Sequence, residues 1–294
     1  MSIDADPGQV HHDHLAVRNL SGFEVTFVLN AADGYLTDAG RFNTLPSDQE
    51  SVDAGTWISL PDSVSVPAGS TVVVPFVISI PSSAEPGDHA AGVSASVRST
   101  SGGAGSGVGV ESRVGFRVTV RVSGEIAPSA AIKGIEMDYA MSWNPFAPGE
   151  ISIRFTVSNT GNVRFNARGT VAAGGQSVLF PGPDEATHEF LPGDTRQITA
   201  VVQDVWPTFL VTTTTTLAPD VVTIDGKELT ADPIIKESIL WAMPWSQLIV
   251  LLAIALLIAA ASWNRIRGRR RLAELLRNAR EEGSRDAGTR GEKP

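Results

Sequence analysis

Residues 114–122 read VGFRVTVRV, with an apolar side chain at almost every second position. Alternation with a period of two is typical of a β-strand that has one buried and one solvated face. Residues 63–66 (SVSV), 71–80 (TVVVPFVISI) and 150–157 (EISIRFTV) show related patterns, and Pro75 in the second of these runs favours an edge or bulged position. Short strands between Pro- and Gly-containing turns predict β-sandwiches.

Two further segments favour strands. Residues 91–98 and 111–122 flank the Gly- and Ser-rich segment 99–109, which predicts a hairpin with a long loop at one end of a sandwich. Residues 212–216 are five consecutive Thr. Because β-branched side chains suit a pleated surface, this run is expected to be a strand.

The chain contains a diverged repeat. Residues 17–25 (VRNLSGFEV) match residues 157–165 (VSNTGNVRF) as strand, Asn-containing turn and strand. Residues 66–71 (VPAGST) then match residues 191–195 (LPGDT) in the same order. Two sandwich domains in tandem are the simplest explanation. The alternative is coincidence, because such turns recur in every sandwich family.

An uncharged stretch follows the predicted strands. Residues 239–263 contain no Asp, Glu, Lys or Arg, and residues 248–261 are apolar without a break. At about 1.5 Å per residue, a helix over residues 241–263 is roughly 34 Å long, enough to cross a hydrocarbon core of about 30 Å. A transmembrane helix is therefore predicted, with a buried core helix as the alternative. The tryptophans expected at the two membrane interfaces are Trp241, Trp245 and Trp263.

The residues after this stretch are basic. Residues 264–294 hold ten basic and five acidic side chains, although the whole chain of 294 residues has a net charge of −9. The positive-inside rule therefore predicts a cytoplasmic C-terminus. Residues 269–282 fit a short amphipathic helix on the inner leaflet or a solvated tail, and disorder is expected from residue 283. The Arg cluster next to the membrane comprises Arg265, Arg267, Arg269, Arg270 and Arg271.

The expected layout places sandwich domains at residues 1–124 and 128–225, a juxtamembrane linker at 226–240, the transmembrane helix at 241–263 and the basic tail at 264–294. The absence of Cys excludes a disulfide scaffold and thiolate chemistry. The first residues lack the basic and apolar regions of a signal peptide. We expect a precursor with an upstream signal peptide, because the domains before the membrane helix must be exported.

Five segments are characteristic in their order and spacing: 13–19 (DHLAVRN), 45–49 (LPSDQ), 55–58 (GTWI), 66–70 (VPAGS) and 86–92 (PGDHAAG). Together they resemble the N-terminal module of the WxL-interacting protein family. The resemblance implies a Gram-positive cell-surface protein with a peptidoglycan-binding immunoglobulin-like module, a second immunoglobulin-like module that engages surface proteins, and a C-terminal membrane helix with a basic tail. Residues 128–225 look like a generic surface sandwich, so a WxL protein as partner is not carried over.

The sequence contains no catalytic motif. There is no nucleophile elbow, HExxH pair or phosphate-binding loop, so an enzyme is not expected, nor is a cofactor. His12 and His14 would share one face of a strand and are weak candidates for metal ligands, but no metal site is expected from them. The tail has no aromatic residues, so nucleic acid is not an expected partner.

Glycan sites usually combine an aromatic platform with polar groups, and the candidates for such a site are Tyr35, Trp57, Asp88 and His89. Trp57 begins an apolar strand and is also a candidate for the sandwich core. The expected function is to tether wall to membrane by binding peptidoglycan with the first sandwich and a surface protein with the second. The alternatives are a membrane-bound assembly factor or chaperone that acts by strand addition and a metal-dependent cell-wall hydrolase. Membrane lipids are a further expected partner.

Overall fold

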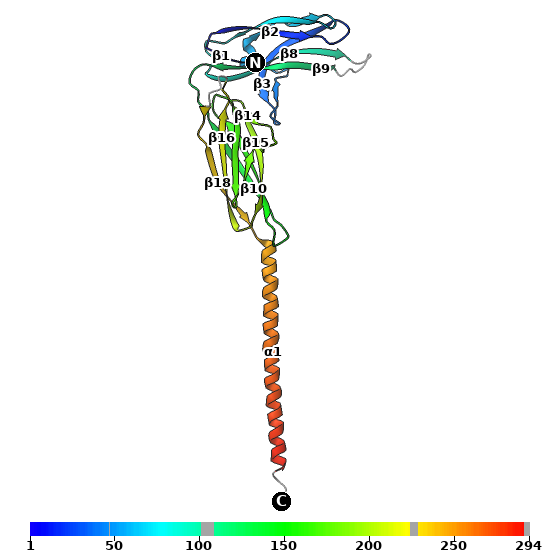
Figure 1. Cartoon of the computed structure of the whole chain (residues 1–294), viewed down its shortest axis with the longest axis vertical. Helices are drawn as coiled ribbons and strands as arrows, with labels where there is room; N and C mark the ends of the chain where they lie inside the picture. Colours follow the sequence, from blue (N-terminus) through cyan, green and yellow to red (C-terminus); the bar gives the residue numbers. More distant parts are fainter. Residues whose placement is uncertain (47, 101–108, 224–228, 291–294) are drawn as a thin grey trace.

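The computed structural model describes residues 1–46, 48–100, 109–223 and 229–290. Figure 1 shows three parts in line: a group of strands that includes β1 to β9, a second group that includes β10 to β18, and the long helix α1 (Trp245–Arg290). The protein is therefore mostly β-sheet with one apolar helix at the C-terminal end.

The first group of strands forms two sheets, here called the N-terminal sheet pair. One sheet has the order β1-β9-β8-β3-β4, with β6 also paired to β3, and the other has the order β2-β7-β5. The core between them contains Phe76 and Ile78 of β7 and Val93, Val118 and Val120 of β8 and β9. The strands are β1 (Ser2–Ala5), β2 (Val10–Arg18), β3 (Val25–Leu36), β4 (Phe42–Thr44), β5 (Ile58–Ser59), β6 (Ser63–Val66), β7 (Thr71–Ser79), β8 (Gly87–Thr100) and β9 (Gly109–Val122), with a 3-10 turn at Ala54–Trp57.

The second group also forms two sheets, here called the C-terminal sheet pair. One has the order β10-β11-β15 and the other β13-β12-β16-β17, with β14 paired to β12 and β18 to β16. Ile151, Ile153 and Phe155 of β11 share a buried core with Phe165 and Val171 of β12. The strands are β10 (Ala130–Ala140), β11 (Gly149–Asn159), β12 (Phe165–Ala173), β13 (Gln176–Phe180), β14 (His188–Phe190), β15 (Thr195–Val205), β16 (Phe209–Val221), β17 (Leu229–Thr230) and β18 (Ile234–Ala242).

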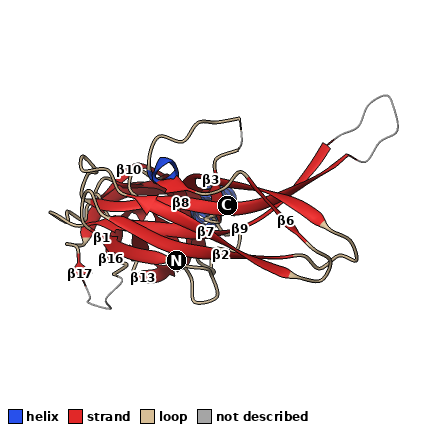
Figure 2. Ribbon diagram, turned by 90° about the horizontal axis from the view of Figure 1, so that it is seen from above, coloured by secondary structure: helices blue, strands red, loops and turns tan. Residues whose placement is uncertain are grey.

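The strands predicted from alternation are confirmed as β6, β7, β9 and β11, and the Thr run lies in β16. The predicted hairpin is confirmed by the pairing of β8 with β9, which extends to Thr100 opposite Gly109. Residues 101–108 of its expected loop lie outside the described residues. Figure 2 shows this hairpin projecting sideways from the body. At Pro75, β7 is paired only with β2, because β5 pairs only with Val77 and Ile78, so this Pro lies at a local sheet edge.

The segments matched by the sequence repeat occupy equivalent places in the two sheet pairs. Strand β2 pairs with β7 as β11 pairs with β15, and β3 lies beside β6 and β8 as β12 lies beside β14 and β16. The turns after β2 and β11 are each built on a buried Asn. The side-chain amides of Asn19 and Asn159 donate to the carbonyls of Phe23 and Val163 at 2.7 and 2.8 Å.

The second matched segment closes the same turns. The N–H of Asn19 donates to the carbonyl of Ser70, and the N–H of Asn159 to the carbonyl of Asp194, each at 2.9 Å. Buried Asn side chains are stable when their hydrogen bonds are satisfied. The sequence repeat therefore corresponds to the same local structure in both sheet pairs.

The C-terminal end of the sheets differs from the expected layout. Residues 226–240 were expected to be a linker and Trp241 the first helical residue, but β18 (Ile234–Ala242) pairs with β16, with Trp241 opposite Leu210. Pairing with β16 satisfies the backbone hydrogen-bonding groups of this segment. It therefore forms a strand although it contains the charged residues Lys236 and Glu237. Residues 226–228 of the expected linker, and residues 224–225 of the expected second domain, lie outside the described residues.

Helix α1 begins at Trp245, after only Met243 and Pro244. Among the described residues it is the one helix long and apolar enough to cross a membrane, by length and composition, over Trp245–Asn278. It continues without a break to Arg290. The segment expected as a separate amphipathic helix is therefore part of α1, and residues 283–290, expected to be disordered, are helical.

Candidate functional site

The junction between the sheet pairs is built around Asp88 of β8, whose side chain is fully buried. Its carboxylate accepts hydrogen bonds from Arg121 Nε and Nη2 at 2.7 and 2.6 Å. It also accepts the backbone N–H of Arg164, from the C-terminal sheet pair, at 2.8 Å. One carboxylate therefore binds groups on both sides of the junction.

A second acidic group completes a charge network there. Glu189 accepts two hydrogen bonds from Arg117, at 2.7 and 2.9 Å, and lies 3.6 Å from Arg164 Nη1. Burial, and then the nearby cation of Arg117, lower the pKa of Arg164 below its ordinary value. The network therefore holds three Arg against two carboxylates in a largely buried place, which is stable only while each carboxylate stays charged and in position.

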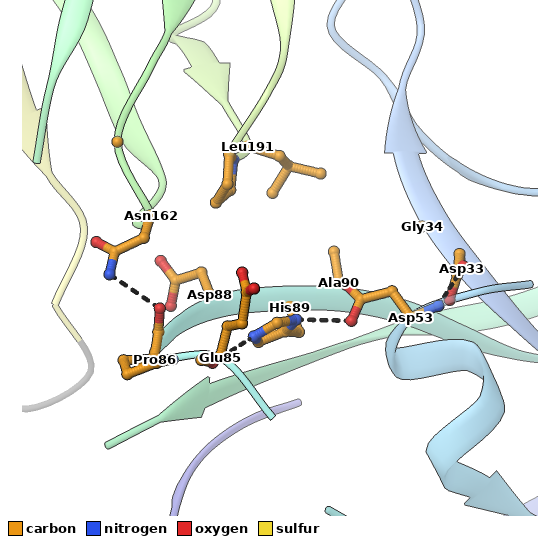
Figure 3. Close-up of a pocket in the computed structure, with 12 residues that line it drawn as sticks. Asp33, Gly34, Asp53, Glu85, Pro86, Asp88, His89, Ala90, Asn162 and Leu191 are labelled. Atoms are coloured by element: carbon orange, nitrogen blue, oxygen red, sulfur yellow. Dashed lines mark hydrogen bonds and ion pairs between the residues drawn. The ribbon is translucent and has the colours of Figure 1, made fainter. Parts of the chain in front are cut away.

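The backbone of the junction is equally close. Asn162 accepts the N–H of Asp88 at 2.8 Å and donates from Nδ2 to the carbonyls of Pro86 and Glu125 at 2.9 and 2.8 Å (Figure 3). Gly87 has a φ of +134°, and a Cβ there would lie 2.1 Å from the Asn162 oxygen. The Pro86-Gly87-Asp88 segment is thus fixed against the turn that follows β11.

His89 lies beside this contact, with both ring nitrogens engaged. Nδ1 is 2.7 Å from Asp53 Oδ1 and Nε2 is 2.9 Å from the carbonyl oxygen of Glu85 (Figure 3). Its ring lies 4.7 Å from that of Trp57. Burial alone would lower the pKa of His89, but the hydrogen bonds to Asp53 and Glu85 raise it above its ordinary value of 6.5.

A cavity of about 400 Å³ opens at the junction. Asp33, Asp53 and His89 line it from the N-terminal sheet pair, and Asn162 and Leu191 from the C-terminal one (Figure 3). This volume is within the range of small-ligand sites. The lining is acidic and hydrogen-bonding, which suits a small polar group rather than an apolar one.

The candidate glycan residues are distributed unevenly around this cavity. Asp88 and His89 line it, but their polar atoms are already bonded within the protein. Trp57 is 8% exposed and belongs to the core. Tyr35 pairs with Asn43 and does not line the cavity.

The candidate metal ligands lie elsewhere. The exposed residues His12 and His14 occupy one face of β2, opposite Val77 and Pro75. Among the described residues, no group of three or more His, Asp or Glu side chains is placed to hold a metal ion. A metal-dependent hydrolase therefore has no ligand set in the part of the chain that the structure describes.

A different site lies at an edge of the N-terminal sheet pair. In the C-terminal sheet pair β10 pairs with the outer side of β11 and also lies beside β18. In the N-terminal sheet pair β2 ends its sheet, and no described strand takes the place of β10. Strand β1 covers only part of the same side, because it pairs with β9 over Thr119 to Val122 alone. We call this side of β2 and β9 the open edge.

An apolar cleft of about 480 Å³ lies at the open edge between the two sheets. Val114 in its wall is 75% exposed, and Leu20 at its rim is 82% exposed. Exposed apolar side chains beside unpaired strand edges are typical of a surface that takes up another strand. The apolar side chains that line the cleft include Leu15, Val17, Leu20, Phe27, Val114 and Phe116.

Sequence reasoning did not single out the Arg residues of the junction or the open edge. Arg117 and Arg121 lie four residues apart on the polar side of the VGFRVTVRV run, and this spacing was the available signal for a shared polar contact. No local pattern marks an edge strand that lacks a neighbour, because that property belongs to the sheet.

Comparison with protein-family models finds no match, and comparison with curated proteins finds none either. Comparison with solved structures finds several matches. The CupB2 chaperone of Pseudomonas aeruginosa is 12% identical, with 79% of this chain and 92% of that chain covered and a TM-score of 0.33.

Two more comparisons are of the same kind. A structure described as a chaperone-tip adhesin complex in CFA/I fimbriae biogenesis is 10% identical, with 81% and 95% covered and a TM-score of 0.41. The E. coli chaperone DraB is 13% identical, with 80% and 94% covered and a TM-score of 0.33. Identities and TM-scores this low establish neither a shared family nor a shared activity.

Proposed function

We propose that this chain is a membrane-anchored, non-enzymatic binding protein that captures an extended segment of a partner surface protein as an added β-strand. On this proposal the two sheet pairs are tandem immunoglobulin-like domains outside the cell, and α1 crosses the plasma membrane once, with its Arg cluster in the cytoplasm. The protein would serve as an assembly factor or scaffold for surface proteins. The observation that carries the proposal is the open edge of β2.

The C-terminal sheet pair indicates what the added strand looks like. Strand β10 runs antiparallel to β11. Its buried Ile132 and partly buried Met137 and Tyr139 pack against the core of that sheet pair. A strand added to β2 in the same way would place alternate apolar side chains over the cleft beside Leu15 and Phe116. Main-chain hydrogen bonds would then give affinity, and the cleft would select the side chains.

A synthetic peptide with the β10 sequence, residues 130–140 (AAIKGIEMDYA), is a direct probe for the open edge. The full chain in nanodiscs is titrated with the labelled peptide, and amide hydrogen exchange is measured at saturation. We expect saturable binding and slower exchange in β2. The β10 sequence alternates over Ile135, Met137 and Tyr139, after the register shift between Lys133 and Glu136. A scrambled peptide with its apolar residues grouped together should therefore bind weakly, because it loses this alternation.

Val114→Asp places a charge in the cleft at an exposed position. Losing the burial of one Val and adding a charge should cost about 1.5 kcal/mol or more, or roughly tenfold in Kd. The matched control is Val73→Asp, at an exposed position on β7, which should leave the Kd unchanged. Slower exchange in β11 instead of β2, or equal effects of both substitutions, would contradict strand addition at the open edge.

A second candidate function, peptidoglycan binding, follows from the family resemblance. The junction cavity supports it, because it has the size of a small-ligand site and Glu85 is among the acidic residues that line it. The full chain should sediment with purified sacculi, and Glu85→Arg at the cavity rim should reduce the bound fraction severalfold. The same substitution should leave binding of the β10 peptide unchanged, so the two functions are separable. Failure of the full chain to sediment with sacculi would refute peptidoglycan binding, and sedimentation that Glu85→Arg does not affect would refute the junction cavity as its site.

A further inference from the structure

Exposed aromatic side chains gather at the end of the C-terminal sheet pair from which α1 begins. They lie in or directly beside three connections: β10 to β11, β15 to β16, and β18 to α1. Pairing places these connections at one end of the sheets, since Ala140 lies opposite Glu150, and Phe209 opposite Ala242 (Figure 1). We call these side chains the aromatic collar: Trp143, Phe146, Trp206, Phe209, Trp241 and Trp245.

The collar is held close to the start of α1. The side chain of Gln247, in the first turn of the helix, donates to the carbonyl of Pro145 at 3.2 Å. Ala242 and Ser246 on either side of the strand-to-helix connection are buried. The sheet end and the helix therefore meet without a flexible spacer, and wherever α1 enters a bilayer the collar lies beside the entry point.

The composition of the collar matches the membrane interface. Residues 141–148 read MSWNPFAP and carry no charge, although Phe146 is 83% and Trp143 73% exposed. Aromatic rings of this kind are favourable at the level of lipid headgroups and are costly in open water. The uncharged part of α1 begins in the same place, so the collar continues the apolar surface of the helix onto the sheets.

We propose that the collar inserts into the outer leaflet and that the C-terminal sheet pair is seated directly on the phospholipid bilayer. This inference rests on α1 crossing the membrane, as proposed above. Seating at several points would hold the sheets at a fixed tilt and keep the N-terminal sheet pair, which lies at the opposite end of the molecule from α1, away from the membrane (Figure 1).

The absence of Cys allows a spin label to be placed at single sites. Phe146→Cys and Trp143→Cys report on the collar. Leu179→Cys is the matched control, because Leu179 is a 60% exposed apolar residue of the same sheet pair. It pairs with Thr170, which lies opposite Thr216, seven residues along β16 from Phe209, or roughly 23 Å from the collar end. Ile254→Cys reports on the helix itself.

Each labelled full-length variant is reconstituted in nanodiscs, and collision rates of the nitroxide with oxygen and with a water-soluble nickel chelate are compared. We expect labels at 146 and 143 to have a ratio of oxygen to nickel collisions severalfold above that at 179, and the label at 254 to have the highest ratio.

Ratios at 146 and 143 equal to that at 179, with 254 in the bilayer, would overturn the collar and leave the membrane span intact. A water-exposed label at 254 would overturn the span itself. Shielding of 146 from both reagents would indicate a protein partner at the collar and would also refute lipid insertion.

Discussion

The substitution Asp88→Asn isolates the electrostatic part of the junction, because Asn has nearly the shape of Asp and lacks its charge. In the native protein the carboxylate accepts three hydrogen bonds, two from Arg121 and one from the N–H of Arg164. After the substitution one amide oxygen is left as an acceptor, and the amide NH₂ faces the guanidinium of Arg121. The side chains of Arg121 and Arg164 are only 13% and 10% exposed, so water does little to replace the lost charge.

The expected cost follows from this burial. Removing one partner of a buried ion pair typically costs about 3 to 5 kcal/mol. Because the Asn oxygen is still able to accept from Arg164, and Arg121 keeps its contact with the carbonyl of Val222 at 2.7 Å, we expect the lower end, about 3 kcal/mol. Against a total stability of about 5 to 15 kcal/mol, this is a large share.

The assay is urea unfolding of the full chain in nanodiscs, together with hydrogen exchange at the amides of residues 88 and 164. Asp220→Asn is the control, because Asp220 pairs with Arg168 at 3.5 Å with both side chains largely exposed, and such pairs contribute about 0 to 1 kcal/mol. We expect Asp88→Asn to lower the free energy of unfolding by about 3 kcal/mol and to speed exchange at both amides. A loss no larger than that of Asp220→Asn would refute the reasoning that the junction depends on a buried charge.

Three further predictions concern single residues. Asn19→Ala and Asn159→Ala should each lower the free energy of unfolding by about 1 to 3 kcal/mol, since each removes the buried hydrogen bonds that the Asn amide donates to backbone carbonyls, and equal losses in urea titrations would support the equivalence of the two turns. His89 should titrate above 6.5 by NMR; because its pKa is raised on folding, its contribution to stability is complete below pH 6.5 and is lost as pH rises through the folded pKa, and His89→Gln should remove that slope. Gly87→Ala should destabilise by more than about 1 kcal/mol in thermal unfolding, because its φ is positive and its Cβ would collide with the backbone, whereas Gly22→Ala, which has open space around it, should change little.

Strands with strong alternation could be predicted from the sequence, because a strand with one buried and one solvated face has apolar residues at every second position. Strand β18 was missed because its sequence, IIKESILWA, mixes apolar and charged residues and resembles a linker. What makes it a strand is the neighbouring edge of β16, where Thr213 to Leu217 supply the pairing groups. A tertiary partner thus overrode a weak local preference.

The candidate site shows the same limit in another form. Asp88 and His89 were predicted to be site residues from the Pro-Gly-Asp-His segment, and both line the junction cavity in the structure. The partners of Asp88 are far away in the sequence, 33 residues for Arg121 and 76 for Arg164. An Asp after this turn is able to bind a ligand or to hold two sheet pairs together. The Pro-Gly-Asp-His segment alone could not distinguish these two roles.

The difference between the two sheet pairs also bears on how selective the open edge is. If an added strand buries three apolar side chains, the gross gain is about 5 to 9 kcal/mol at 1.5 to 3 kcal/mol each. Ordering a flexible segment costs about 1 to 2 kcal/mol per residue of backbone, or about 5 to 10 kcal/mol for the roughly five residues that three alternating side chains need. This cost offsets the whole gain unless main-chain hydrogen bonds form along β2. Because a slip of one residue turns every apolar side chain away from the cleft, a segment without regular alternation loses both contributions together. The open edge should therefore discriminate by the period of its partner's sequence more than by the identity of any one side chain.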